Sequence, residues 1–134
     1  MDSKEVYQKW TSIDNLRRAY DVDAIFWDSE GLSFVLVVDD SQATLDDIQK
    51  LKVTWNSSAV ISYHVTDETY RSDCWQLDFV NNGRFYICKG SQYIERFREK
   101  SPLFPDNAIH FVLVGTNTIV DILAKDYPVI RLSE

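Results

Sequence analysis

The sequence predicts an α+β domain in which helices pack against a mostly antiparallel sheet, with a helix at the N-terminus. Over residues 3–20, apolar side chains recur at spacings of three and four, which is typical of an amphipathic helix. Residues 59–66 and 75–80 show the side-chain alternation of half-buried strands. Asn82 and Gly83 separate two strand-like runs, and this pair favours the tight turn that joins antiparallel strands.

The first half of the chain is expected to contain two helices and a hairpin. The apolar face of the first helix would consist of Val6, Trp10, Ile13, Leu16 and Tyr20. Two strand-like runs follow at 24–28 and 32–38, and the three residues between them include Gly31, so they predict a hairpin. Thr44 can cap a short helix after this hairpin. The apolar face of that helix would consist of Leu45, Ile48 and Leu51.

In the second half, the Asn-Gly turn predicts that strands 70–80 and 84–89 are antiparallel neighbours. A helix is expected to begin at Ser91 and to end before Pro102. Its apolar face would consist of Tyr93, Ile94 and Phe97.

The C-terminal part continues with a predicted strand at 110–115, a helix at 117–125 and a short strand at 128–132. No internal repeat and no linker-like segment interrupts the sequence. Residues 1–134 are therefore expected to form one domain with one core.

Composition places the chain among ordinary globular proteins, because 45% of its residues are hydrophobic and 26% are charged. Its N-terminus lacks the basic and apolar regions of a signal peptide, and no apolar run has the length of a membrane helix. We therefore expect a soluble, cytoplasmic protein that does not bind membranes.

The charge balance also restricts the partners. Twenty-one acidic and 14 basic residues give a net charge of −7, which repels nucleic acid backbones and attracts basic partners. The acidic residues are spread along the chain, a distribution that also serves solubility. No nucleic acid partner is expected.

Asp39 and Asp40 end the apolar run at 34–38 and precede an amphipathic stretch. The segment VLVVDDSQATLDDIQKL resembles the first strand, acidic pair and first helix of bacterial response-regulator receiver domains. That resemblance implies a Mg²⁺ and phosphoryl site, which also needs a third carboxylate at the end of a parallel strand. Asp78 is the only candidate, and it precedes the predicted hairpin, not a crossover helix. We expect the pair to be favourable charges near a helix N-terminus, with the receiver-like site as an alternative.

Other catalytic or metal-binding patterns are scarce. The two histidines, His64 and His110, each lie in a predicted strand without a second ligand at metal-binding spacing, so both are expected to be structural. The sequence contains no Gly-rich phosphate loop and no nucleophile elbow. These observations predict a protein without cofactor, metal or catalytic activity.

Aromatic residues make up 13% of the chain, and several lie near the acidic segment DETYRSD at 67–73. A ring beside carboxylates suits a protein interface, in which the ring anchors the partner and the charges steer it. Most rings are expected to fill the core. The predicted partner-binding residues are Asp67, Glu68, Tyr70 and Asp73.

In size, charge and expected architecture, the chain resembles bacterial immunity proteins, including those of contact-dependent growth inhibition systems. The resemblance implies a cytoplasmic protein that binds a cognate, often basic toxin and blocks its active site. A phage-encoded inhibitor that mimics nucleic acid is the other alternative, because it would share the acidity.

The two cysteines are expected to be free thiols. With a two-residue turn at Asn82-Gly83, Leu77 lies opposite Cys88, so Cys74 is three positions out of register and on the opposite face of the sheet. That geometry does not permit a disulfide. Cys88 is expected to point into the core.

Overall fold

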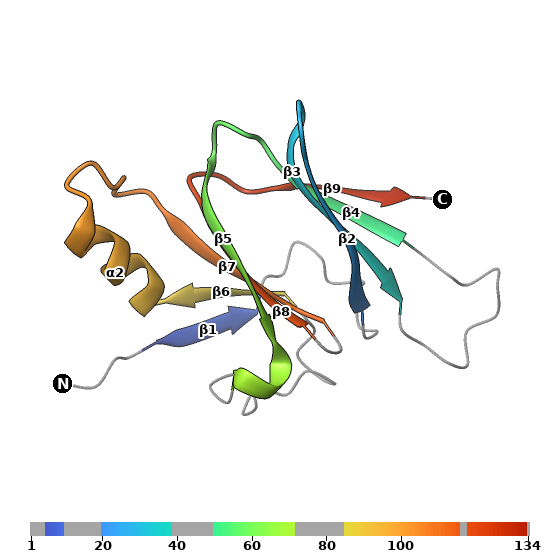
Figure 1. Cartoon of the computed structure of the whole chain (residues 1–134), viewed down its shortest axis with the longest axis horizontal. Coiled ribbons are helices and arrows are strands. Elements are labelled where there is room, and N and C mark those ends of the chain that lie inside the picture. Colours follow the sequence, from blue (N-terminus) through green and yellow to red (C-terminus); the bar gives the residue numbers. More distant parts are fainter. Residues whose placement is uncertain (1–4, 10–19, 39–49, 72–84, 116–117, 134) are drawn as a thin grey trace.

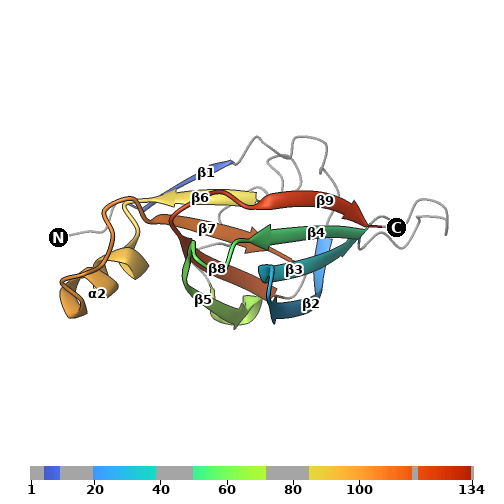
Figure 2. The same cartoon turned by 90° about the horizontal axis from the view of Figure 1, so that it is seen from above.

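The computed structural model describes residues 5–9, 20–38, 50–71, 85–115 and 118–133 of the chain. These residues form a five-stranded and a four-stranded sheet, and the inner faces of the two sheets share one core (Figure 1). Figure 2, seen from above, shows the two sheets lying against each other and α2 (Gln92–Lys100) projecting at one end.

All neighbouring strands of the five-stranded sheet are antiparallel. Their order across the sheet is β1 (Val6–Lys9), β6 (Phe85–Lys89), β7 (Ile109–Val114), β8 (Thr118–Ala124) and β5 (Val60–Asp67). Among the described residues, β1 and β5 therefore end this sheet.

The four-stranded sheet is also antiparallel throughout. Its order is β2 (Tyr20–Asp28), β3 (Gly31–Val38), β4 (Lys50–Trp55) and β9 (Val129–Ser133). Asp28 pairs with Gly31, so only two residues, Ser29 and Glu30, connect β2 to β3. Gly31 has φ +129°, a backbone conformation that side chains rarely permit, which explains a glycine here.

The core fills the space between the sheets. Alternate residues of β3 and β4 point inward, and the buried ones are Leu32, Phe34, Leu36, Leu51, Val53 and Trp55. The five-stranded sheet contributes Phe85, Phe111, Leu113, Val120, Ile122 and Ala124. An edge-to-face ring contact joins the two layers. The ring centroids of Trp55 and Phe111 lie 5.2 Å apart. Removal of this apolar surface from water is the main stabilising contribution to the fold.

The outer face of the five-stranded sheet carries a second apolar cluster, formed by Tyr86, Cys88, Val112, Val114 and Ile119. The helix α2 lies beside this face, and the 3-10 helix η3 (Glu68–Tyr70) follows β5. Ser91 caps α2, because its side-chain oxygen accepts a hydrogen bond from the backbone N–H of Ile94 at 3.1 Å. No helix in the described part of the chain has the length and apolar character needed to cross a membrane.

The predicted α+β class with an N-terminal helix is wrong. The described residues form mostly antiparallel strands with one α-helix, which lies late in the sequence. Part of the expected helix at 3–20 is β1, whose residues Val6–Lys9 pair with β6. The spacing of apolar residues over 3–20 reflects only neighbours in the sequence. The conformation of β1 depends on pairing with β6, about 80 residues away, which that spacing does not show.

Two further assignments are wrong. The helix predicted at 117–125 is β8, which lies between β7 and β5 and is buried on both faces, so its near-continuous apolar run shows no strand period. Leu51, assigned to a helix face, lies in β4, where Leu51, Val53 and Trp55 point to the core on alternate residues. The sequence itself contains this alternation, since Lys52 and Thr54 separate the three apolar residues.

Several predicted elements are confirmed. The hairpin at 24–38, the strands at 59–66, 84–89, 110–115 and 128–132, and the helix that begins after Ser91 all occur with small shifts of their ends. Tyr70, the first residue of the strand predicted at 70–80, lies in η3, and residues 72–80 of that strand lie outside the described residues. The start of the Thr44 helix, the Asn82-Gly83 turn and the pairing across it also lie outside them.

Candidate functional site

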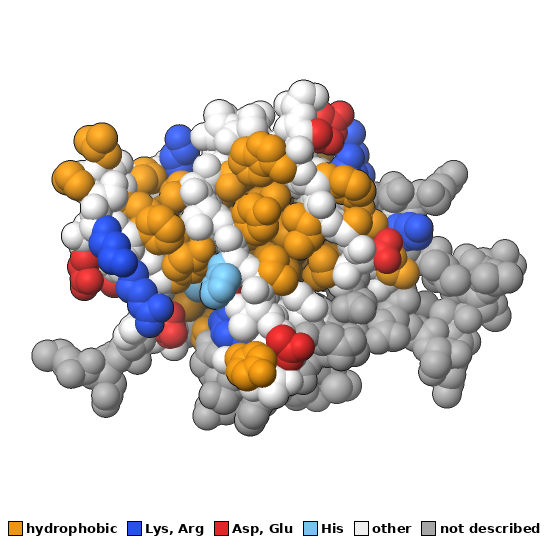
Figure 3. All heavy atoms as spheres, in the orientation of Figure 1, with side chains coloured by type: hydrophobic (Ala, Val, Ile, Leu, Met, Phe, Trp, Pro, Cys, Tyr) orange, Lys and Arg blue, Asp and Glu red, His pale blue; other side chains and the backbone are white. Residues whose placement is uncertain are grey.

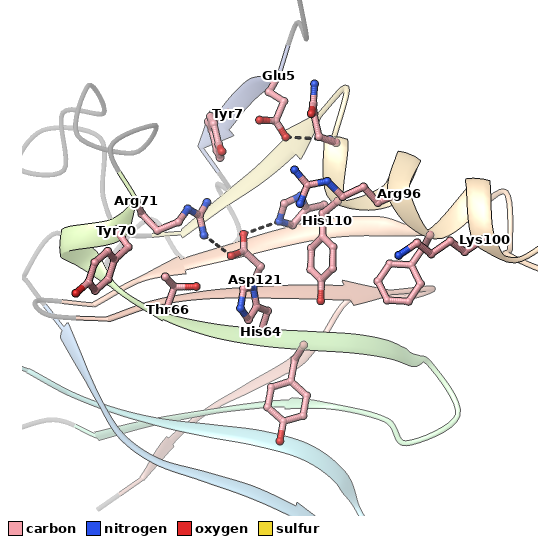
Figure 4. A pocket seen from close by; sticks show the side chains of 14 residues that line it. Glu5, Tyr7, His64, Thr66, Tyr70, Arg71, Arg96, Lys100, His110 and Asp121 are labelled. Atoms are coloured by element: carbon pink, nitrogen blue, oxygen red, sulfur yellow. Dashed lines mark hydrogen bonds and ion pairs between the residues drawn. The ribbon is translucent and has the colours of Figure 1, made fainter.

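A buried polar network lies on the outer face of the five-stranded sheet. Asp121 of β8 accepts hydrogen bonds from two sides, although its side chain is only about 4% exposed. His110 Nε2, on β7, lies 2.7 Å from Asp121 Oδ1, and Arg71, which follows η3, forms an ion pair with Oδ2. On the other side of the imidazole, Nδ1 lies 2.7 Å from Ser91 Oγ. The carboxylate thus connects two strands and the end of η3 (Figure 4), and His110 extends the network to Ser91 at the N-terminus of α2.

The direction of these hydrogen bonds follows from the Asp121 carboxylate, which can only accept. Ser91 Oγ accepts the N–H of Ile94, so its own hydroxyl can donate to His110 Nδ1. The proton of the imidazole then lies on Nε2 and is donated to Asp121. This arrangement satisfies each of these buried polar atoms, as burial in a low-dielectric interior requires.

The connectivity of Ser91, His110 and Asp121 is that of a serine hydrolase triad, yet its geometry favours a structural role. Ser91 and His110 are both buried, and the serine oxygen is already engaged by the helix N-terminus. In the catalytic arrangement the serine contacts Nε2 and the aspartate contacts Nδ1, which is the reverse of what occurs here. The network therefore positions α2 and η3 against the sheet.

Above this network lies a cavity of about 760 Å³ between α2 and η3. Four side chains that line this cavity from α2 are Tyr93, Arg96, Phe97 and Lys100. Their spacings of three, one and three residues place them on one face of the helix. Tyr70, Arg71 and Thr66 form the opposite wall, and His64, His110 and Asp121 lie between the walls. Figure 4 shows the guanidinium groups of Arg71 and Arg96 directed toward the middle of this cavity from its two sides.

Glu5 and Cys88 meet at one edge of the cavity. Glu5 Oε2 accepts the backbone N–H of Gln92 at 3.0 Å, at the first turn of α2, and lies 3.6 Å from Cys88 Sγ. Burial, together with the negative charge of Glu5, raises the pKa of the Cys88 thiol to about 12. Cys88 is a buried free thiol, as expected, but it points to the outer face of its sheet and not into the main core. Cys74 lies outside the described residues.

Next to the cavity, four exposed apolar side chains form a surface that we call the edge patch: Ile25, Trp27, Tyr63 and Val65. Ile25 and Trp27 of β2 pair with Phe34 and Leu32, so they point toward the inner side of their sheet.

Tyr63 and Val65 of β5 pair with Ile122 and Val120 and point inward as well. Among the described strands, β2 and β5 each end their sheet, and the ring of Tyr63 contacts Phe34 of β3. Trp27 is 58% exposed. Figure 3 shows hydrophobic side chains gathered over the middle of this face.

The predicted partner-binding residues occupy the end of β5 and η3. Asp67 is exposed, and its carboxylate accepts the backbone N–H of Thr69, which lowers the pKa of this carboxyl group. Tyr70 is 80% exposed and lines the cavity, whereas Asp67, at the end of β5, does not line it. Glu68 lies in η3, and Asp73 lies outside the described residues.

Sequence reasoning missed the buried network and the edge patch. A single aspartate in the apolar run TIVDILA was a usable signal, because a buried carboxylate requires partners. His110 was interpreted as structural, and its partners agree with that interpretation. Asp39 and Asp40 lie outside the described residues, and no group of three or more His, Cys, Asp or Glu side chains within the described residues could hold a metal ion.

Comparison of the chain with protein-family models, with curated proteins and with solved structures finds no match.

Proposed function

We propose that this chain is a non-catalytic binding domain that engages a protein partner through the edge patch. The observation that carries the proposal is the exposure of Ile25, Trp27, Tyr63 and Val65 on two strands that end their sheets in the described part of the chain. Large contiguous apolar surfaces are rare on monomeric proteins, and Trp and Tyr side chains dominate the binding energy of many interfaces.

The charges around the edge patch favour a basic partner. Asp28 at the end of β2 and Asp67 at the end of β5 are both exposed, and the whole chain carries a net charge of −7. Opposite charge on the partner would accelerate association, while the apolar centre would slow dissociation. These properties support the more specific proposal of a cytoplasmic immunity protein that covers the active site of a basic toxin.

The alternatives receive less support. A receiver-like phosphoryl site requires a carboxylate at the end of a parallel strand, whereas every strand pair among the described residues is antiparallel. A nucleic acid mimic needs a dense acidic surface, whereas the edge patch is apolar.

The proposal includes no catalytic step, and this part has its own test. A fluorophosphonate probe, which reacts with activated serines, is expected to leave Ser91 unmodified, because Ser91 is buried and caps α2. Labelling of Ser91 that is lost in a His110→Gln variant would replace the proposal with a hydrolase.

Partner binding is tested by affinity capture from the native organism with three immobilised proteins. They are the wild type, a Trp27→Ala/Val65→Ala variant of the edge patch and a Val129→Ala control. Val129 is 55% exposed on β9, the opposite end of the four-stranded sheet. We expect a basic protein to be retained by the wild type and the control and lost from the edge-patch variant. Equal retention by all three would contradict an interface at the edge patch.

A further inference from the structure

The cavity between α2 and η3 has properties that a protein interface at the edge patch does not use. Its volume of about 760 Å³ lies in the range of sites that enclose a small organic molecule, and it exceeds the space that one carboxylate or phosphate group fills. The cavity also has two different kinds of lining, positive charges and aromatic rings.

The positive charges lie mainly on α2. Arg96 and Lys100 are four residues apart and line the cavity from the same helix face. Within the described residues, neither side chain forms a hydrogen bond or ion pair, whereas Arg98 on another face of α2 pairs with Glu95. In a chain with a net charge of −7, two cations without an acidic partner at a cavity mark a place for an anion.

The acidic groups of the cavity are already engaged. Asp121 pairs with Arg71 and His110, and Glu5 accepts the N–H of Gln92 at the N-terminus of α2. The charges of Arg96 and Lys100 are therefore not neutralised by hydrogen-bonded contact with either carboxylate. Figure 4 shows the guanidinium of Arg96 inside the cavity near His110.

The rings form a prearranged platform. The hydroxyl of Tyr93 lies 2.8 Å from Ser62 Oγ, and its ring contacts His110 edge-on at 5.5 Å between centroids. The ring centroid of Phe97 lies 5.5 Å from that of Tyr93, and the ring centroid of His64 lies 6.3 Å from that of Tyr93. Aromatic side chains held in this way offer stacking surface to a planar ligand at little entropic cost.

We propose that this cavity binds an organic phosphate that carries a planar ring, of the size of a nucleoside monophosphate. Arg96 and Lys100 hold the phosphate, and Tyr93, Phe97 and His64 contact the ring. The site adjoins the partner surface proposed above at Tyr63, which lines the cavity, whereas Ile25, Trp27 and Val65 do not line it.

The test compares AMP, adenosine and inorganic phosphate by isothermal titration calorimetry on the full chain. We expect AMP to bind at least about ten-fold more tightly than either fragment, because only AMP uses both the cations and the rings. Absence of AMP binding at about 10 mM, or equal binding of AMP and phosphate, would overturn the proposal.

Two variants locate the site. Arg96→Gln/Lys100→Gln is expected to weaken AMP binding at least about ten-fold, whereas Arg98→Gln, which removes a cation from another face of the same helix, should change it less than about two-fold. Amide chemical shifts should change along α2 and in β5 near His64. Equal weakening by both variants, or shifts confined to other regions, would show that AMP binds elsewhere.

The outcome is independent of the protein partner. Trp27→Ala/Val65→Ala should bind AMP like the wild type, and Arg96→Gln/Lys100→Gln should retain the captured protein. Failure of AMP binding with intact capture would reject only the cavity ligand, and the reverse result would reject only the partner surface.

Discussion

Asp121 shows how one buried carboxylate can determine the arrangement of several elements. It is buried, and its partners Arg71 and His110 lie 50 and 11 residues before it in the chain. Burial of a charge is unfavourable unless it is paired and hydrogen-bonded, so these contacts are obligatory once Asp121 lies in β8. The pairing of this one buried carboxylate therefore determines where η3 and α2 lie on the sheet.

Substitution of Asp121 by Asn should test this coupling. The amide keeps the shape but loses the charge opposite Arg71, and its NH₂ group cannot accept a hydrogen bond from either neighbour. We expect the free energy of unfolding, measured by urea denaturation, to fall by about 2–4 kcal/mol.

The control for Asp121→Asn is Glu95→Gln, which breaks the exposed ion pair with Arg98. Glu95→Gln should lower the free energy of unfolding by about 0.5 kcal/mol or less, since solvent screens such pairs. Similar small losses in both variants would mean that the buried network does not stabilise the fold.

Cys88 provides a second test at the residue scale. In a Cys74→Ser background, a thiol reagent near neutral pH should modify no cysteine in the native protein and one in urea. Burial and a pKa raised to about 12 keep the thiolate fraction very low. Rapid native modification would show that Cys88 is accessible.

The same pKa shift has a consequence for stability. A thiol whose folded-state pKa lies above the unfolded value of 9.0 contributes its full stabilisation below about pH 9 and loses it as the pH rises toward 12. Urea denaturation between pH 8 and 11 should therefore show a steeper loss of stability for the wild type than for a Cys88→Ala variant. Parallel curves would contradict the shifted pKa.

At the scale of elements, the β2–β3 hairpin depends on Gly31. A Cβ built at this position would lie 2.0 Å from the backbone oxygen of Trp55 in β4, and the φ of +129° is itself unfavourable for a side chain. We expect Gly31→Ala to reduce the free energy of unfolding by about 3 kcal/mol or more.

Gly90→Ala is the matched control for Gly31→Ala. Gly90 has φ +69°, in the left-handed region, where the backbone conformation alone is unfavourable for a side chain. Its cost should be about 1 kcal/mol. Equal losses of stability in the two variants, measured by thermal or urea unfolding, would show that the contact with β4 adds nothing to the cost of Gly31→Ala.

The elements also show what the sequence could and could not predict. Local chemistry identified the hairpin at Gly31 and the helix capped by Ser91, because a glycine-containing turn and an N-cap act within a few residues. It failed for β1 and β8, because β1 pairs with the distant β6 and β8 lies between β7 and the distant β5.

The candidate site was predictable to a similar extent. Of the residues named from the composition of segment 67–73, Tyr70 lines the cavity, and the partner-binding role of Asp67 and Tyr70 stays a prediction. The meeting of Ser91, His110 and Asp121 was not predictable, because it requires the register of β7 against β8 and the position of α2.

For the whole molecule, the proposed partner surface and the proposed ligand cavity differ in chemistry. The edge patch is apolar with acidic side chains near it, whereas the cavity carries Arg96 and Lys100. The net charge of −7 therefore does not describe every surface of the molecule. A basic protein would be attracted to the first surface, and an anion to the second.

Charge reversal near the edge patch should separate local attraction from the effect of net charge. Asp67→Lys changes the net charge from −7 to −5, and so does Asp106→Lys, an exposed position in the loop after α2. If a basic partner docks on the edge patch, Asp67→Lys should slow its association about two- to five-fold at low salt, and salt should reduce this difference. Asp106→Lys should slow association less, because screening acts over about 8–10 Å at ordinary ionic strength. Equal rates for the two variants in stopped-flow measurements would mean that only the net charge of the molecule steers the partner, and the interface would have to be sought on another face.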